Sequence, residues 1–590
     1  MPGVSAPQRP RRCVHWRLLV RHARRVPGTH RSYGATPDAA RPWARQPHRV
    51  PELDTSPRRV VSVRAARLHH LWSDVSGIDQ WNERRPRLVT DGDSPSPPTP
   101  SLGARAARGS AITLATQLTR SLVLLGGTIV LARMVAPADF GLIAMVVAVS
   151  GVAEILRDSG LSWAALRRTD LTQQQRSNLF WINAAIGLGL TAGVFGLSWP
   201  LAAFYGEDVL VQTVQWIAPI YFLNGVATQF RVAINLDLRF GALAIIDVAA
   251  PAVALGLAVA VAAGGQGLAA LVVQQLATAV LALLLTIPLA RWWPSLPRRA
   301  PEMRALFGFG MSFASVQLLS YATRNIDSIA IGRVYGARPL GLYDQAYQLS
   351  VAPLVLLNSP MSRVAVPVLS RVRDDRPRYI KALRDAQLIA TYVTATVLLV
   401  AAGVGTPLIT LLLGANWAAA GPIFSVLAVG SVFRSIQQIA NWIFVVEDKA
   451  GSMLRLNLVG QPIIVALILL GLFWGPIGVA TGGSLGWCVF WLMSLVWVQR
   501  TTGLPVRPLV TDAVRIVGVV GLPAGAAALL VTLLVPFAPL WVVILGVAAA
   551  AAWCCIALIS RRVRSDVRTL TRFARLAAKG GSQPSRANDA

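Results

Sequence analysis

Arginine interrupts three long apolar segments of this 590-residue chain, at Arg120, Arg324 and Arg434. A charge near the centre of a bilayer costs roughly 2.5–3.5 kcal/mol on insertion scales, so each position needs a reason. A guanidinium group keeps its proton and presents a planar fork that matches phosphate oxygens. If the three segments span a membrane, their arginines predict an interior that binds an anionic head group such as a phosphate or pyrophosphate.

Uncharged polar side chains accompany each arginine at helical spacing, so each set shares one face of its helix. Their amide and hydroxyl groups suit the hydroxyls of a sugar. We therefore expect the three faces to line a watery cavity and not to face lipid. The residues are Thr113, Thr116 and Gln117 beside Arg120, Gln317, Tyr321 and Ser328 beside Arg324, and Gln438 and Asn441 beside Arg434.

Three carboxylates of the same apolar regions, Glu154, Asp247 and Asp327, are candidates for coupling transport to an ion. The sequence does not choose among them. They also allow a second interpretation of the cations, because Arg120 could pair with Glu154, and Arg324 with Asp327 one turn on. The arginines would then be structural, and the pattern leaves both interpretations open.

Motifs for catalysis are missing from the apolar part of the sequence. All six His residues precede residue 109, which excludes a His proton relay there, and no P-loop motif is present. The loops are too short for an extramembrane catalytic domain, so we predict a transporter and not an enzyme, with no cofactor and no metal. Four Cys residues without paired spacing predict no disulfide framework; they are Cys13, Cys488, Cys554 and Cys555.

The elements that must position these residues are apolar runs of roughly 20 residues, the length needed to cross ~30 Å of hydrocarbon. They alternate with short polar loops from Gly109 onward, and 54% of the chain is hydrophobic. This pattern predicts an all-α polytopic membrane protein with about fourteen transmembrane helices. The expected spans are 110–132, 140–157, 177–203, 211–231, 243–263, 267–290, 305–332, 341–362, 386–413, 419–446, 454–474, 477–499, 512–535 and 539–560.

Positive charge in the loops gives this arrangement a direction. Alternate loops hold 22 Lys and Arg residues on one side and 3 on the other. Because basic loops stay in the cytoplasm, the pattern predicts a multi-pass protein of the cytoplasmic membrane with both termini in the cytoplasm.

A short corner occurs twice in the sequence, as LARMVAPADFGL from Leu131 and as IGRVYGARPLGL from Ile331. Six expected crossings separate the two copies, so both run in the same direction. This indicates two like-oriented blocks related by an axis along the membrane normal, with substrate between them. A second pair of segments, WPLAAFYGED and TPLITLLLGANW, supports the repeat. The alternative is that the similarity reflects loop chemistry alone.

These patterns predict five regions. The first is an Arg-, Pro- and Ser-rich extension with 20 Arg against 8 acidic residues, too polar to bury a core and therefore expected to be disordered. A start codon assigned too early, or a basic arm for anionic lipid, are alternative explanations of this extension. The regions are 1–108 for the extension, 109–300 for an N-lobe of helices 1–6, 301–500 for a C-lobe of helices 7–12, 501–562 for helices 13–14, and 563–590 for a disordered cytoplasmic tail.

Several segments resemble the polysaccharide exporters and flippases of the multidrug/oligosaccharidyl-lipid/polysaccharide exporter superfamily, over about residues 108–500. The resemblance is closest to the branch that exports lipopolysaccharide, exopolysaccharide and teichuronic acid. The segments are LARMVAPADFGLIAMV, LRDSGLSWAALRR, LTQQQRSNLFWINAAIGL, NIDSIAIGRVYGARPLGLYDQAYQLSVAPL and VPVLSRVRDD.

The resemblance implies two lobes around a central cavity and the transfer of an undecaprenyl-pyrophosphate-linked oligosaccharide between leaflets. It implies that cationic cavity residues hold the pyrophosphate, a role that we assign to Arg120 and Arg324. The expected partners are this lipid-linked substrate, the bilayer and other membrane proteins of polysaccharide assembly, but no nucleic acid. Two alternatives remain, an ion-coupled multidrug exporter of the same superfamily and a membrane polysaccharide polymerase or ligase.

Overall fold

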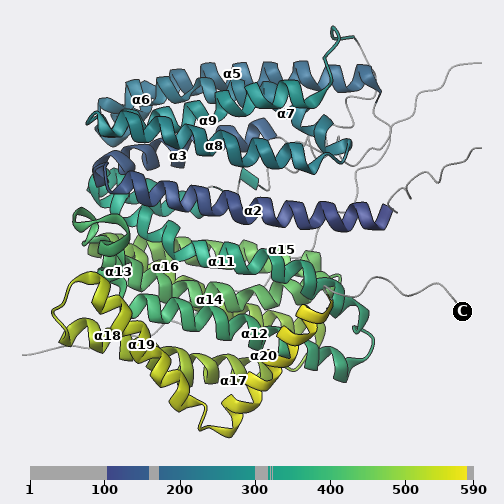
Figure 1. Cartoon of the computed structure of the whole chain (residues 1–590), viewed down its shortest axis with the longest axis vertical. Helices are drawn as coiled ribbons and strands as arrows, with labels where there is room; N and C mark the ends of the chain where they lie inside the picture. The colour runs from purple at the N-terminus through teal and green to yellow at the C-terminus, as the bar shows by residue number, and fades with distance from the viewer. Residues whose placement is uncertain (1–101, 159–171, 299–316, 319–320, 322, 581–590) are drawn as a thin grey trace, which may run out of the picture. The chain divides into compact units, whose positions relative to one another are not determined.

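The computed structural model describes residues 102–158, 172–298, 317–318, 321 and 323–580 (Figure 1). All of them lie in Thr99–Ala590, the second of two units into which the chain divides. Every regular element among the described residues is helical. Those preceding residue 299, here called the first block, are α2 (Leu102–Ala132), α3 (Pro137–Asp158), α5 (Gln173–Tyr205), α6 (Val209–Ile217), α7 (Pro219–Leu236), α8 (Phe240–Ala263) and α9 (Gly267–Ala290).

The second block begins with the helical residues 323–335 and ends with α16. Its other elements are α11 (Ala337–Arg371), α12 (Arg376–Gly403), α13 (Gly405–Leu413), η3 (Ala415–Trp417), α14 (Ala420–Val446), α15 (Ala450–Gly471), η4 (Leu472–Trp474) and α16 (Gly475–Thr502). The remaining elements are α17 (Arg507–Arg515), η5 (Ile516–Gly521), α18 (Leu522–Leu534), α19 (Pro539–Ala557) and α20 (Arg561–Gly580).

The predicted class of an all-helical, polytopic membrane protein is confirmed, whereas the count of fourteen spans is not. Among the described residues, eleven helices are long and apolar enough to cross a membrane, or twelve if the two halves of the bent α11 form one span. One of the eleven is the 53-residue stretch Ala450–Thr502. It contains Gly475 at φ +76°, where the left-handed backbone reverses the chain, and α15 packs against α16. About half of the expected span 305–332 lies outside the described residues.

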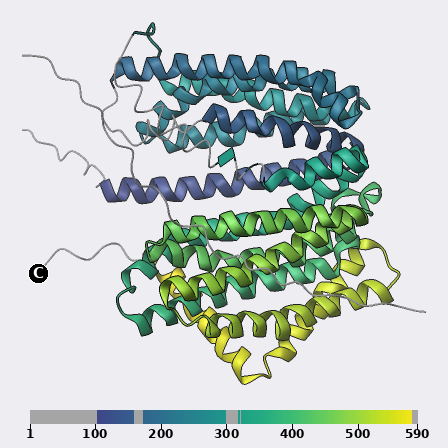
Figure 2. The same ribbon diagram turned by 180° about the vertical axis from the view of Figure 1, so that it is seen from behind.

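Packing within each block involves both helices that follow each other in the chain and helices separated by another crossing. In the first block α5 packs on α7 and α8 on α9, and in the second α14 packs on both α11 and α16. Helix α2 contacts α8 and, in both views, runs between the remaining helices of the two blocks (Figures 1 and 2). The largest contact between the blocks is that of α3 with α11, the two helices that begin at the repeated corners.

The end of the chain differs from the sequence prediction. Residues 563–590 were expected to form a disordered tail, but helix α20 extends from Arg561 to Gly580. Val563 and Asp566 are buried, and Val563 packs with residues of α12, η5 and α19. The charge of this segment favours solvent, but its apolar positions recur with helical spacing and give it a face that can be buried.

Candidate transport site

The two copies of the repeated corner lie against each other at one end of the blocks. A side-chain carbon at Gly141 would overlap the carbonyl oxygen of Ala337, and one at Gly341 would overlap that of Pro137. Since Pro137 and Ala337 are themselves equivalent positions of the repeat, the contact is the same in both directions. Two α-helices approach this closely only where small residues face each other. The structure thus gives the glycine of the repeated corner a physical role, which is to allow the close contact between the two blocks at this end.

Trp417 adds a second contact at this end. Its indole N–H donates to the carbonyl oxygen of Ala132, at 2.7 Å, and its ring packs edge-on against Phe140 of α3 with centroids 5.3 Å apart. The side chain is fully buried. Because its partners belong to the first block and Trp417 to the second, this residue holds the blocks together.

The equivalent arginines of the two corners each reach the end of a helix of the other block. Arg133 donates from Nε to the carbonyl oxygen of Leu412, at 3.0 Å, and from a terminal nitrogen to that of Leu411. These are among the last carbonyls of α13, where a cation is favoured. The guanidinium of Arg333 instead lies 5.7 Å from the ring centre of Phe204, near the end of α5.

A chain of polar and aromatic contacts surrounds Arg434 in the second block. Its guanidinium donates to the hydroxyl of Tyr347, at 3.0 Å, and lies 5.0 Å from the ring centre of Trp487. The Tyr347 ring stacks on Tyr343, whose hydroxyl donates to the carboxylate of buried Asp327 at 2.8 Å. The helical residues 323–335, α11, α14 and α16 therefore meet in one cluster.

Other predicted residues of α14 bond to one another. The amide of Asn441 donates to Gln438 at 3.2 Å and to Gln437 at 3.4 Å, and Gln437 donates back to Asn441. These three amides form a network on one helix. Gln438 and Asn441 are half-buried, and Gln437 is buried.

The cation predicted in the first segment is exposed. Arg120 and Gln117 lie on α2, within the candidate span Ala115–Ala132, and both side chains are exposed. The span as a whole is mostly unburied within the protein. A charged residue at this depth is stable only where its head reaches water or an anionic partner.

The seventh expected helix carries Arg324, the second cation assigned to the pyrophosphate. Arg324 and Gln317 are exposed, while Tyr321 is half-buried. The hydroxyl of Tyr321 donates to the carbonyl oxygen of Val147 on α3, at 2.6 Å, and fills the space beside Gly151. Tyr321 therefore makes a contact between the blocks, a role different from the expected one of facing sugar.

The candidate coupling carboxylates have partners in the structure. Glu154 pairs with Arg157 at 2.7 Å, and Asp247 pairs with Arg231 of α7 at 2.5 Å. Both oxygens of Asp327 accept hydrogen bonds, one from Tyr343 and one from the backbone N–H of Ser328. The predicted site residues did not include Arg157, Arg231, Tyr343, Tyr347 and Trp487, although the tyrosines of YDQAYQ were a visible signal.

Comparison with solved structures shows which proteins share this fold. The structure aligns with a solved structure titled "Lipid II flippase MurJ, inward closed conformation" at a TM-score of 0.58, 13% identity and 76% coverage of this chain and 99% of the other. It also aligns with an inward-facing multidrug resistance MATE family transporter at a TM-score of 0.51 and 16% identity, covering 65% of this chain and 95% of the other. The chain therefore has the helical fold shared by these membrane transporters.

Sequence comparisons narrow the class to a family. A family model described as "Polysaccharide biosynthesis protein" matches residues 130–422, a range that contains both corners. The teichuronic acid biosynthesis protein TuaB of Bacillus subtilis is 28% identical over 50% of this chain and 62% of its own length, so the chain spans less than two thirds of this relative. The lipopolysaccharide biosynthesis protein WzxC of Escherichia coli K12 is 23% identical, over 65% of this chain and 78% of its own length.

By its match over residues 130–422, the chain belongs to this family of polysaccharide biosynthesis proteins. It is a multi-pass membrane protein whose helical fold is shared with solved membrane transporters. Another relative, the succinoglycan biosynthesis transport protein ExoT of Rhizobium meliloti, is 23% identical over 51% of this chain and 61% of its own length.

Proposed function

We propose that this protein moves an oligosaccharide, linked to an undecaprenyl-pyrophosphate-type lipid, across the cytoplasmic membrane for cell-surface polysaccharide synthesis. Family membership and the names of the relatives support transport in polysaccharide biosynthesis. The observation that carries the finer proposal is that Arg120 and Arg324, one from each block, present exposed guanidinium groups on apolar helices.

The distribution of charge supports an orientation. In the described part of the chain, the basic loops near residues 231–242, 363–384 and 447–455 join helices at the ends away from the repeated corners. We therefore place that end and both termini in the cytoplasm. The corners then close the outer side. In this state the lipid-linked substrate enters between the blocks from the cytoplasmic leaflet.

In the proposed transport cycle, the blocks close at the cytoplasmic end as they open at the outer end. The pyrophosphate docks on Arg120 and Arg324, whose N–H groups replace the water that the phosphates lose. The polyprenyl chain stays in lipid while the sugar occupies the polar space beside Gln117, Gln317, Gln438 and Asn441. Rocking of the blocks separates Gly141 from Gly341 and opens the outer side.

Leaflet exchange of a defined lipid-linked sugar in proteoliposomes tests this proposal. A hydrogen bond to a charged group contributes roughly 1.5–3 kcal/mol, so Arg120→Ala and Arg324→Ala are each expected to lower the exchange rate by about 10- to 100-fold. Arg378→Ala is the matched control, because its side chain is 79% exposed in the first turn of α12. Protein levels should be unchanged in all three variants.

Two results would contradict the proposal. One is full exchange in both cavity variants, which would remove the assigned role of the cations. The other is transport of cationic drugs by the wild-type protein without exchange of the lipid-linked sugar, which would favour a multidrug exporter. Exchange measured with and without an ion gradient then shows whether Glu154, Asp247 or Asp327 needs to be tested for coupling.

A further inference from the structure

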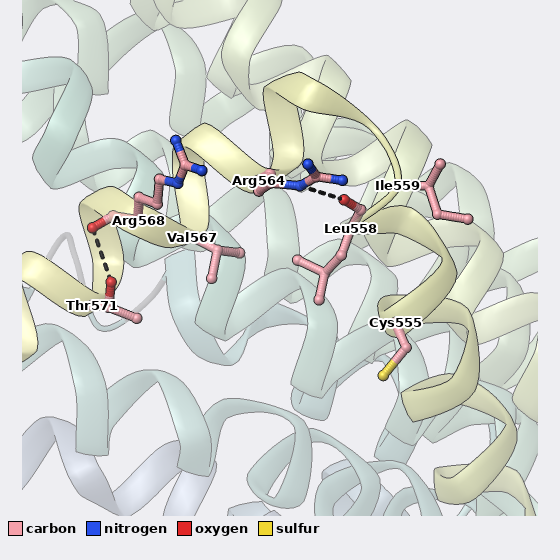
Figure 3. A pocket seen from close by; sticks show the side chains of 7 residues that line it. All are labelled: Cys555, Leu558, Ile559, Arg564, Val567, Arg568 and Thr571. Carbon is pink, nitrogen blue, oxygen red and sulfur yellow. Dashed lines mark hydrogen bonds between the residues drawn. The ribbon is translucent and has the colours of Figure 1, made fainter.

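A cleft lies between the end of α19 and the basic helix α20, far along the chain from the proposed transport site (Figure 3). It has a volume of about 440 Å³. One wall is formed by α19 and the turn after it, and the other by successive turns of α20. The lining residues are Cys555, Leu558, Ile559, Arg564, Val567, Arg568 and Thr571.

Helix α20 is fixed to the protein by its buried face. The carboxylate of Asp566 accepts a hydrogen bond from the Tyr392 hydroxyl at 2.9 Å and pairs with Arg515 at 2.9 Å. Arg515 also pairs with Asp512, which binds Arg384 of α12. Because Asp566, Tyr392 and Arg515 are buried or half-buried and partnered, they set the rotation of α20 about its axis, and with it the face that borders the cleft.

The cationic face of α20 borders the cleft. Arg564 and Arg568 are one turn apart on this helix and both are exposed. Arg564 donates from Nε to the carbonyl oxygen of Leu558, at 3.3 Å, which directs its guanidinium over the end of α19 (Figure 3). The sequence of α20 has seven basic residues and one acidic residue, and that acid, Asp566, faces the protein.

The opposite wall is apolar and exposed. Ile559 is 74% exposed, and Leu558 and Cys555 are also exposed beside it. Helix α19 is a candidate membrane span, so this wall lies where the apolar span ends and the basic helix begins. A ligand that fits must place negative charge near two guanidinium groups and apolar chains along α19.

We propose that this cleft binds the head group of an anionic phospholipid, with its acyl chains against the end of α19. Basic residues just outside a membrane span attract anionic lipids, and the apolar wall favours a lipid over a free phosphate ion. The assignment to the cytoplasmic leaflet uses the orientation proposed above, but the binding itself does not depend on what the protein transports.

The natural thiols supply a direct probe. Cys555 lines the cleft and is exposed, whereas Cys488 of α16 is half-buried elsewhere and serves as an internal reference. The full chain in nanodiscs is labelled with a maleimide and the rate at each Cys is measured by mass spectrometry. Phosphatidylglycerol is expected to slow labelling of Cys555 relative to Cys488, and phosphatidylcholine or inorganic phosphate is not.

Variants separate this site from general attraction to charge. The double substitution Arg564→Gln with Arg568→Gln should weaken the protection by phosphatidylglycerol about tenfold or more. The control is Arg561→Gln with Arg562→Gln, which removes the same charge from exposed positions of α20 outside the cleft. Protection that is equal in both double variants, or that inorganic phosphate alone reproduces, would overturn the proposal. Unchanged labelling of Cys488 shows that the variants are folded.

Discussion

The two copies of the repeated corner have nearly the same backbone contact but different side-chain contacts. Gly141 and Gly341 each face the main chain of the opposite corner. Arg133, however, donates two hydrogen bonds to carbonyl groups of α13, whereas Arg333 lies over the ring of Phe204. Trp417 reinforces the side on which Arg133 lies.

This difference indicates how a repeat can be both symmetric and directional. The glycines set how closely α3 and α11 can approach. Because a side chain at either position would prevent this approach, both corners keep a glycine. The surrounding side chains determine how strongly each corner is bound to the opposite block. We therefore expect the contact of Arg133 and Trp417 with the other block to be the stronger half of the closure, and that of Arg333 the weaker half.

Substituting the corner glycines should have the largest effect on closure. A methyl group in Gly141→Ala or Gly341→Ala would overlap backbone, which cannot move aside as a side chain can. Overpacking of this kind costs roughly 1–3 kcal/mol, so the ratio of closed to open protein should fall by about 5- to 150-fold. Thiol labelling of an introduced Cys at the corner measures that population.

Gly196→Ala on α5 is the control, because a methyl group there would have open space around it. If Gly141→Ala and Gly341→Ala behave like this control, the close contact between the corners does not exist in the membrane. If only one of them opens the corner, the backbone contact is not equivalent in its two halves.

Removing the indole N–H of Trp417 should have an intermediate effect. Trp417→Phe keeps an aromatic ring against Phe140 but leaves the buried carbonyl of Ala132 without its donor. Such a loss costs roughly 1–3 kcal/mol, and the same labelling assay should report it as a shift of at least about fivefold. Trp216→Phe, at a 56% exposed position, should leave labelling unchanged. A wild-type level of labelling in Trp417→Phe would show that the hydrogen bond does not hold the blocks.

The two arginines should give the smallest effects, and unequal ones, because both side chains are exposed and water screens their contacts. Arg133→Gln loses charge-assisted hydrogen bonds to α13, whereas Arg333→Gln loses one cation–π contact. At an exposed site, the loss of that contact should change the ratio of open to closed protein by less than about fivefold. Labelling should therefore increase more for the first variant than for the second. Equal increases, or the reverse order, would contradict the asymmetry described above.

The sequence predicted much of the fold, whereas the assignment of the site residues stays a prediction. The apolar runs and the loop charges predicted a polytopic helical protein, and the paired corners were visible because a repeat conserves the types of Arg133, Gly141 and Leu142 at a fixed offset. What the sequence could not show was that the two corners touch. A repeat specifies equivalent positions, but not which of them meet across the axis.

The predicted polar faces were limited in a similar way. Helical spacing correctly grouped Arg434 with Gln438 and Asn441 on one helix, but the partners of Arg434 are Tyr347 and Trp487, on two other helices. Likewise, spacing in α20 could have indicated a buried face at Val563, but the pairing of Asp566 with Tyr392 and Arg515 depends on how distant helices pack. Local periodicity defines a face, and only the packed structure defines what the face contacts.

The most direct test measures whether the lipid-linked substrate opens the contact between the two corners. Ala337 is 8% exposed and faces Gly141, so Ala337→Cys in a background without the native Cys residues reports opening, while Arg338→Cys in the same turn reports accessibility of an exposed position. In proteoliposomes, a lipid-linked pyrophosphate oligosaccharide should increase labelling at residue 337 but not at residue 338, and Arg324→Ala should abolish the increase. Leaflet exchange of that substrate with labelling at residue 337 unchanged would contradict the account.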